Sequence, residues 1–478
     1  MLEAHAHQQL KDLLRLEGSA PWPHHLSLSR LVARSLRRGD HTLVRLAPGS
    51  DPSWWISLLV PLALSECPLA LVVGEAQRQR LLRIELPRLS KAKPSIALPC
   101  FEGNLPPKDA RVWLLNHQQL VAAWQQGLLG ERQLVIPEAE QLDTLLRQAL
   151  EVVVTPQHWD QLRRAQPAAE SSLLSLHQRL NRRVLSAPRR PNQLVALAPE
   201  DEAPLRHLLQ LLSPLPVPWP AWLAAKGEGW TSWGQLNPQL LQWELHRHPL
   251  EPLAVLRGLF DQRGAVLLGQ LLPGSELGLR PAVSLNLGDP PLADPLPLYA
   301  PLRQPLPNSP QYGQHLLDQS RRLVLGQAGL TIVLIDDVAL RLGLASGLAA
   351  EFGSRVVHES TAPEVNGVIC AGWSWWLEQQ SRLQLPSQIV IALLPIASLE
   401  DPLTAARVMA LRQDGRDWFR EGLLPDALNR LQLGVAGLRR QGAGRLAVLD
   451  GRLRGRSWGR QVLAALEPWV NLTRLLPH

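Results

Sequence analysis

A turn between a strand and a helix near residue 50 has the layout of a phosphate-binding loop. The segment HTLVRLAPGSDPSWWISLLVPLAL places a strand-like run, a turn with Gly49 and Ser50, and an apolar helix in that order. A P-loop also needs a lysine for the β- and γ-phosphates and a serine or threonine for magnesium. Ser53, Trp54 and Trp55 stand where Gly-Lys-Ser/Thr would be, and no lysine of the chain follows a glycine and precedes a serine or threonine. Taken alone, the segment favours a plain turn.

A second candidate is an acidic residue at the end of an apolar run. Residues 134–142, LVIPEAEQL, have the form of a strand that ends in an acidic box. In nucleotide hydrolases a carboxylate at such a strand end holds magnesium, and a neighbouring residue orients the attacking water. Here Pro137 replaces the first acid, while Glu138 and Glu140 follow it. Glu138 is the candidate catalytic residue, although the segment alone is typical of a strand followed by a helix.

Other chemistry-bearing patterns are weaker. Asp336 and Asp337 follow the apolar run TIVLI, and a lone DEA triplet occupies 201–203, but both favour solvated turns. The three cysteines lie far apart without a CxxC pair, so neither a disulfide framework nor a zinc site is indicated. The 14 histidines are scattered, and we interpret them as structural. The sequence therefore predicts no metal site.

Composition favours a globular protein with an acidic partner. The 478 residues exceed one hydrophobic core, and the net charge of +7 with a pI near 9.9 comes almost entirely from arginine. A GC-rich genome is an alternative cause of the arginine bias. The mixed-charge N-terminus does not resemble a signal peptide. Pro61, Glu66 and Pro68 interrupt the apolar stretch 54–73, so we expect no membrane span and a cytoplasmic location.

Short apolar runs alternate with helical patterns in two parts of the chain. HTLVRL, LALVV, ARVWLLN, QLVIPE and EVVVTP form the first set, and GAVLLGQLL, TIVLIDD, SRVVHE, GVICAG, QIVIALLP and RLAVLD the second. Such alternation predicts α/β lobes with mostly parallel sheets. Residues 161–263 are rich in proline and tryptophan and predict a largely helical insertion. The run SLNLGDPPLADPLPLYAPLRQPLPNSP predicts an extended connector.

In order along the chain, these segments resemble the DinG/XPD-like helicases of superfamily 2. Asn116 and His117 match the family's NHxLL signature just before the DEAH box, and Trp375 and Trp376 match an aromatic pair of the second lobe. The C-terminal segment matches most strongly, at positions Pro425, Ala427, Arg430, Leu431, Gly434, Leu438, Arg440, Leu449, Asp450, Arg452 and Gly459. Gly437 stands where the motif VI arginine finger belongs, which leaves Arg440 as the retained arginine of that motif.

The resemblance implies two RecA-like lobes with a helical insertion in the first. It places the first lobe at 1–160, the insertion at 161–263, a returning strand at 264–290 and the second lobe at 291–478. It also implies ATP and Mg²⁺ as cofactors, although the P-loop lysine, the first acid and the arginine finger are missing. We expect Trp54 and Trp55 to fill the cleft between the lobes instead. The family's iron–sulfur cluster uses four cysteines between motifs I and II, where only Cys67 and Cys100 lie, so no cluster is expected.

Three hypotheses for function follow. The first is a nucleic-acid-binding pseudo-helicase, with single-stranded DNA as the expected ligand and Arg439, Arg452, Arg454, Trp375 and Trp376 as candidate contacts. The arginines are equally compatible with a solvated helix face. The second is an active ATP-dependent DNA helicase of repair or replication, with Gly49, Ser50 and Ser53 at the nucleotide. The third is a structural module that binds a protein partner.

Overall fold

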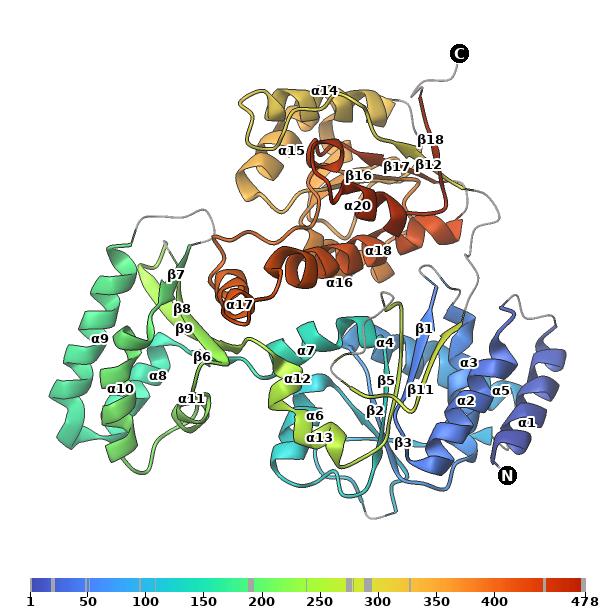
Figure 1. The fold of residues 1–478 in the computed structure, drawn as a ribbon, viewed down its shortest axis with the longest axis horizontal. Helices are drawn as coiled ribbons and strands as arrows, with labels where there is room; N and C mark the ends of the chain where they lie inside the picture. Colours follow the sequence, from blue (N-terminus) through green and yellow to red (C-terminus); the bar gives the residue numbers. More distant parts are fainter. Residues whose placement is uncertain are drawn as a thin grey trace.

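The protein folds into two α/β lobes and one lateral insertion (Figure 1). The computed structural model describes residues 2–18, 22–47, 50, 52–93, 96–107, 109–187, 193–237, 239–271, 277, 279–287, 295–325, 328–441 and 444–473. In Figure 1 the first lobe is blue to cyan with a returning yellow-green segment, the insertion is mainly green, and the second lobe is yellow to red. Within the described ranges, no helix is long and apolar enough to cross a membrane.

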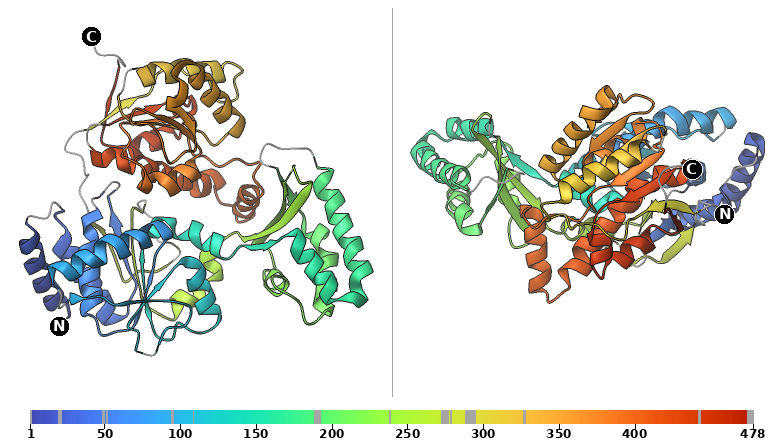
Figure 2. Two further views of the ribbon diagram at one scale, coloured as in Figure 1. Left: turned by 180° about the vertical axis from the view of Figure 1, so that it is seen from behind. Right: turned by 90° about the horizontal axis from the view of Figure 1, so that it is seen from above.

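The first lobe is built on a seven-stranded sheet with the order β11-β1-β10-β5-β2-β4-β3, and its strand pairs are parallel. Its strands are β1 (Thr42–Leu46), β2 (Leu69–Val72), β3 (Cys100–Glu102), β4 (Val112–Leu115), β5 (Gln133–Pro137), β10 (Ala265–Gly269) and β11 (Val283–Leu287). The central strands are apolar on both faces because helices cover both sides of the sheet (Figure 2).

Each face of this sheet has its own hydrophobic core. The first core lies under α1, α2, α3 and α5, and the second lies under α6, α7, α12 and α13. The helices of this lobe are α1 (Leu2–Glu17), α2 (His25–Arg38), η1 (Pro52–Trp54), α3 (Trp55–Leu64), α4 (Glu75–Arg80), the π-helix η2 (Leu81–Glu85), α5 (Leu86–Ala92), α6 (His117–Gln125), η4 (Ala139–Gln141), α7 (Leu142–Ala149), α12 (Pro252–Val255) and α13 (Arg257–Asp261).

The insertion has helices on one side, as expected, and an antiparallel sheet that was not predicted. The sheet order is β6-β9-β8-β7. Its elements are β6 (Val152–Val154), α8 (Pro156–Ala165), η5 (Pro167–Ala169), α9 (Glu170–Leu185), β7 (Leu194–Leu197), α10 (Pro199–Leu211), α11 (Trp219–Ala224), β8 (Trp230–Asn237) and β9 (Gln242–Pro249). The core between helices and sheet contains Trp159, Trp219, Trp222 and Trp243.

The structure moves both limits of the insertion. The run EVVVTP was expected in the first lobe, but its strand β6 pairs with β9 of the insertion. At the other end, α12 and α13 belong to the first lobe, because Leu256, Leu259 and Phe260 join its second core. The elements of the insertion therefore run from 152 to 249, whereas the sequence placed them at 161–263.

The second lobe contains another seven-stranded sheet, with the order β14-β15-β13-β16-β17-β12-β18 and parallel pairs. Its elements are β12 (Leu296–Tyr299), α14 (Tyr312–Leu325), β13 (Thr331–Leu334), α15 (Val338–Phe352), η6 (Gly353–Arg355), β14 (Val356–His358), β15 (Val368–Ala371), α16 (Trp373–Gln379), η7 (Gln380–Arg382), β16 (Gln388–Ile391), α17 (Pro402–Gln413), the π-helix η8 (Phe419–Leu423), α18 (Leu424–Gln441), β17 (Arg445–Val448), α19 (Arg452–Gly455), α20 (Gly459–Ala465) and β18 (Trp469–Asn471).

The expected fold class, two lobes with parallel sheets, is confirmed. The expected connector is partly wrong, because it contains two strands, β11 and β12. Strand β12 tolerates Pro297 because the pairing with β17 uses Leu298 and Tyr299 instead. Sequence alone did not reveal these strands because proline normally signals a break in regular structure.

Candidate nucleotide site and nucleic-acid interface

Three neighbouring strands of the first lobe, β1, β10 and β5, end at one edge of the sheet. In the pairing register, Arg45 of β1 lies opposite Gly269 of β10, and Leu268 of β10 lies opposite Pro137 of β5. The carboxyl ends of parallel strands form the usual ligand-binding edge of an open α/β sheet. The turn after β1 and the acidic segment after β5 therefore lie at the same edge.

Glu138 occupies a strained backbone position directly after β5. Its φ of 60° and ψ of 40° are left-handed, which is uncommon for a residue other than glycine and concentrates at functional sites. Its Oε1 accepts a hydrogen bond of 2.6 Å from Nε2 of Gln77, on α4. Burial raises the pKa of Glu138 to about 8, the negative charge of Glu140 adds to the rise, and the bond from Gln77 opposes it.

Glu140 turns toward the end of β10. Its Oε2 accepts a hydrogen bond of 3.0 Å from the backbone N–H of Gln270. A Cβ atom on Gly269 would lie 2.0 Å from the same oxygen, so this approach requires glycine. Burial raises the pKa of Glu140 to about 7, although backbone hydrogen bonds oppose the rise. The carbonyl oxygen of Glu140 accepts a bond of 2.8 Å from Nδ2 of Asn429, on α18 of the second lobe.

The raised pKa of Glu138 predicts a loss of stability as the pH rises. The folded pKa is about 8 and the reference pKa is 4.5, so the stabilisation is complete below about pH 4.5 and disappears as the pH passes 8. Replacing Glu138 with glutamine removes the buried charge. We expect Glu138→Gln to raise the free energy of unfolding by about 2 kcal/mol at pH 8 and to change it little at pH 5.

Denaturant unfolding at the two pH values measures this difference. Glu131→Gln, at an exposed glutamate before β5, is the matched control and should change stability little at either pH. Equal effects of Glu138→Gln at both pH values would contradict a buried carboxyl with a raised pKa.

In the turn after β1, the side chain of Ser50 bonds back to the backbone at the end of the strand. The Oγ of Ser50 donates a hydrogen bond of 2.8 Å to the carbonyl oxygen of Ala47. Gly49 lies outside the described residues, and Ser53 is half-buried in η1. Trp54 and Trp55 stack with ring centroids 4.7 Å apart, and their exposed fractions are only 8% and 1%.

Both indoles belong to the first core of the first lobe, together with leucines of α1 and α2. The sequence analysis had placed them in a cleft between the lobes. That expectation is wrong because helices packed in front of this sheet face bury them. The side chain at the position of the P-loop lysine therefore points into the lobe.

Two candidate nucleic-acid contacts are also buried. Arg439 is 2% exposed, and its Nη1 donates a hydrogen bond of 2.8 Å to the carbonyl oxygen of Glu467. Trp376 is 1% exposed, and its Nε1 donates a bond of 2.9 Å to the carbonyl oxygen of Gly434. The predictions that Arg439 contacts a phosphate and that a base stacks on Trp376 are therefore wrong for this conformation. Trp375 is half-buried against the same core.

Of the other candidate arginines of the C-terminal segment, Arg452 is described with its side chain and Arg440 without it. Arg452 neutralises Asp450, which is fully buried, through bonds of 3.0 Å from Nε to Oδ1 and 2.6 Å from Nη2 to Oδ2. The same carboxylate accepts the backbone N–H of Leu394 at 2.9 Å, so Arg452 joins two loops of the second lobe. Arg440 lies in α18, but its side chain is outside the described residues.

Comparison with known proteins finds a helicase that is similar in sequence and XPD structures that are similar in fold. The ATP-dependent DNA helicase YoaA of Escherichia coli (strain K12) is 30% identical over 207 residues, which cover 41% of this chain and 32% of YoaA. The XPD structure "XPD_APO" superposes with a TM-score of 0.64 at 14% identity, covering 93% of this chain and all of that chain. The structure of S. tokodaii Xpd4 gives a TM-score of 0.61 at 13% identity, covering 92% and 97%. No family model matches the sequence.

The chain is similar to the DinG/XPD-like helicases of superfamily 2. The relation to YoaA concerns about a third of that protein's length, and the XPD structures share the fold. The resemblance inferred from the order of the motifs is thereby confirmed.

The second lobe carries an aromatic–arginine patch, of which the sequence analysis named Arg454 but missed the aromatic rings. Phe419 lies between Trp418 and Trp458, with ring centroids 5.8 and 5.5 Å apart, and the guanidinium of Arg412 lies 5.0 Å from the Trp418 ring. The patch also includes three exposed arginines without an ion pair to any described residue, Arg454, Arg456 and Arg460. The run RLRGRSWGR, with arginines on both sides of a tryptophan, was the available signal.

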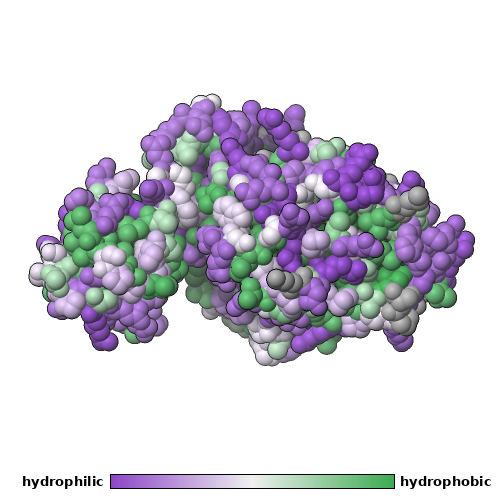
Figure 3. Space-filling model, turned by 90° about the horizontal axis from the view of Figure 1, so that it is seen from below, coloured by the Kyte–Doolittle hydropathy of each residue, from purple (hydrophilic) through white to green (hydrophobic). Residues whose placement is uncertain are grey.

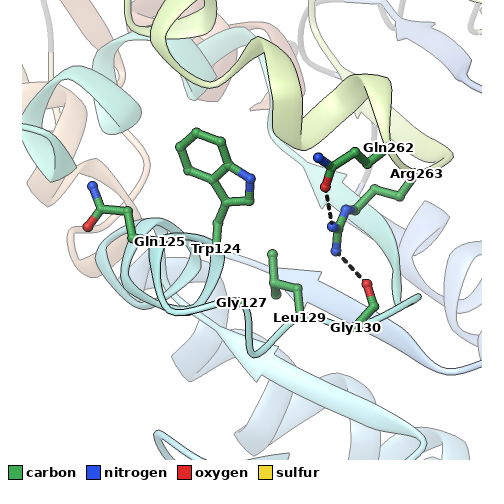
Figure 4. A pocket seen from close by; sticks show the side chains of 7 residues that line it. All are labelled: Trp124, Gln125, Gly127, Leu129, Gly130, Gln262 and Arg263. Carbon is green, nitrogen blue, oxygen red and sulfur yellow. Dashed lines mark hydrogen bonds between the residues drawn. The ribbon is translucent and has the colours of Figure 1, made fainter.

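A hollow in the first lobe lies apart from these sites (Figure 4). It is lined by Trp124, Gln125, Gly127, Leu129, Gly130, Gln262 and Arg263. Arg263 donates to the carbonyl oxygens of Leu259 and Gly130, so its guanidinium is already engaged. The hollow adjoins the amino end of β10, at the edge of the sheet opposite the acidic segment, and we assign no function to it.

Proposed function

We propose that this protein is a nucleic-acid-binding helicase homologue that does not hydrolyse ATP. The observation that carries the proposal is the burial of Trp54 and Trp55 in the core, at the positions of the P-loop lysine and the following serine or threonine. A neutral indole inside the lobe cannot neutralise the charge of β- and γ-phosphates.

The acidic segment also fits magnesium poorly. Mg²⁺ prefers ionised oxygen ligands in octahedral geometry, whereas Pro137 supplies no carboxylate and burial raises the pKa of both Glu138 and Glu140. Gln77 and the N–H of Gln270 already occupy oxygens of these carboxylates. An arginine finger is worth about 10³–10⁵ in rate, and its position is glycine here. We therefore do not propose ATP and Mg²⁺ as working cofactors of this protein.

Nucleic acid is the proposed ligand. The net charge is +7, and the three exposed arginines of the aromatic–arginine patch flank Trp458 in the sequence, whose ring lies 5.5 Å from that of Phe419. Arginine contacts with phosphates and aromatic contacts with bases are the usual means of binding single strands without sequence preference. YoaA is an ATP-dependent DNA helicase, which supports DNA as the nucleic acid. We therefore propose single-stranded DNA as the first ligand to test.

Two measurements on one preparation test the proposal. Fluorescence anisotropy with a labelled single strand measures DNA affinity, and phosphate release measures ATP turnover with the strand bound. We expect DNA binding that MgATP leaves unchanged. A protein that binds no nucleic acid at low salt would overturn the proposal and favour a structural module with a protein partner.

A further inference from the structure

Two histidines and one glutamate meet where the insertion joins the first lobe. Glu151 precedes β6, and His246 and His248 lie two residues apart on β9, so their side chains share a face of the sheet. The Oε1 of Glu151 lies 2.6 Å from Nδ1 of His246 and 2.9 Å from Nε2 of His248. The sequence analysis had treated both histidines as structural, because their partner stands 95 residues away in the chain.

The two imidazoles are enclosed and fixed. His246 and His248 are 9% and 8% exposed, and the indole of Trp233 stacks on both rings, at centroid distances of 5.8 and 4.6 Å. The second ring nitrogens, Nε2 of His246 and Nδ1 of His248, are buried without a hydrogen-bond partner among the described residues. Oε2 of Glu244 lies 3.6 Å from Nε2 of His246, which places a carboxylate behind that ring.

We propose that Glu151, His246 and His248 bind a divalent transition-metal ion, with Zn²⁺ as the first choice. Two imidazole nitrogens and one carboxylate are a common ligand set for zinc, which leaves a fourth position for water. A closer approach of Glu244 would let its carboxylate accept a hydrogen bond from Nε2 of His246, as outer carboxylates do for metal-binding histidines.

The distances allow an ion after a small movement. The three ligand atoms lie within 4.8 Å of one another. Zinc with bonds of about 2.0–2.2 Å separates tetrahedral ligand atoms by roughly 3.3–3.5 Å. The carboxylate therefore has to retreat from the two nitrogens by less than about 1 Å, a shift that a rotation of the Glu151 side chain can supply.

The ion would close the neck of the insertion. The chain leaves the first lobe through Glu151 and returns from β9, where Arg147 of α7 donates to the carbonyl oxygens of Pro249 and Leu250. In the space-filling view a notch separates the insertion, at the left, from the lobes (Figure 3). A bound ion would thus tie the outgoing and returning segments together and restrict movement of the insertion.

Metal uptake tests the proposal without reference to ATP or DNA. Protein stripped with a chelator is titrated with Zn²⁺ in a calorimeter, and Co²⁺ serves as a spectroscopic substitute. We expect one equivalent of Zn²⁺ to bind, a rise in Tm, and Co²⁺ absorption bands typical of nitrogen and oxygen ligands. The double variant His246→Gln and His248→Gln should bind at least 100-fold more weakly, and Glu244→Gln about 10-fold more weakly.

His207→Gln, at an exposed histidine of α10 in the same insertion, is the matched control and should bind Zn²⁺ as the wild type does. Glu151→Gln keeps an acceptor for the histidines but is a poor metal ligand, so it serves if the double variant fails to fold. No uptake of Zn²⁺ by the wild type would overturn the proposal and leave a hydrogen-bonded His–Glu–His cluster. Uptake that Glu151→Gln does not weaken would overturn it as well.

Discussion

Single-stranded DNA binding should weaken by at least 10-fold at low salt when Arg454, Arg456 and Arg460 are replaced by alanine together. The three guanidinium groups are exposed, and none forms an ion pair with a described residue, so they are available to phosphates. Each phosphate neutralised on a single strand contributes about −0.7 to the slope of log K against log salt. The triple variant should therefore reduce the magnitude of that slope by about 2. Anisotropy titrations at several salt concentrations measure both quantities.

A variant of equal charge separates the patch from net charge alone. Arg30, Arg164 and Arg182 are exposed arginines of the first lobe and the insertion, outside the aromatic–arginine patch. Their joint replacement by alanine should lower DNA affinity much less. In addition, Trp458→Ala should cost about 1–3 kcal/mol of binding free energy if a base stacks on this ring. Equal losses in the two triple variants would show that binding follows total charge and that the patch has no special part.

Replacing Trp55 with alanine should lower the free energy of unfolding by about 3–5 kcal/mol, as is usual for a large aromatic side chain removed from a core. Trp55 is 1% exposed and stacks on Trp54 within the core of the first lobe. Urea unfolding followed by circular dichroism measures the change. For comparison, Trp458→Ala removes a half-buried indole from the surface of the second lobe and should cost clearly less.

The size of this loss in the free energy of unfolding shows whether the two indoles lie in the core of the first lobe or in a cleft between the lobes. Sequence alone suggested that Trp54 and Trp55 fill a cleft between the lobes, where truncation would change stability little. A loss of less than about 1 kcal/mol for Trp55→Ala, no larger than that for Trp458→Ala, would show that the indole is exposed in such a cleft.

Periodicity predicted the two lobes because the buried strands are short and wholly apolar. Runs such as TIVL (β13) and VICA (β15) are buried along their whole length, and helical segments separate them, which is the pattern of a parallel sheet covered on both faces. The sheet of the insertion escaped detection because its two long strands, β8 (WTSWGQLN) and β9 (QWELHRHP), are rich in polar residues and lie in a part of the sequence that is rich in proline and tryptophan. Their pairing also joins segments far apart in the chain, as Val153 and His246 show.

The sequence predicted where the candidate site lies, but it did not predict which way the side chains of the site point. The place of Glu138 followed from the end of an apolar strand, but its contact with Gln77 and the approach of Asn429 depend on other elements. Burial is likewise a tertiary property. The arginines of the C-terminal segment look alike in sequence, yet Arg439 is enclosed by carbonyl groups while Arg454 is exposed.

The rate of ATP hydrolysis with saturating single-stranded DNA and Mg²⁺ tests the central claim most directly. The account predicts a rate at background for the wild type, equal to that of Glu138→Gln and unchanged by DNA, because no lysine reaches the phosphates and the acidic segment lacks its first carboxylate. DNA-stimulated turnover in the wild type that Glu138→Gln abolishes would contradict the account and show that Glu138 serves a working ATPase.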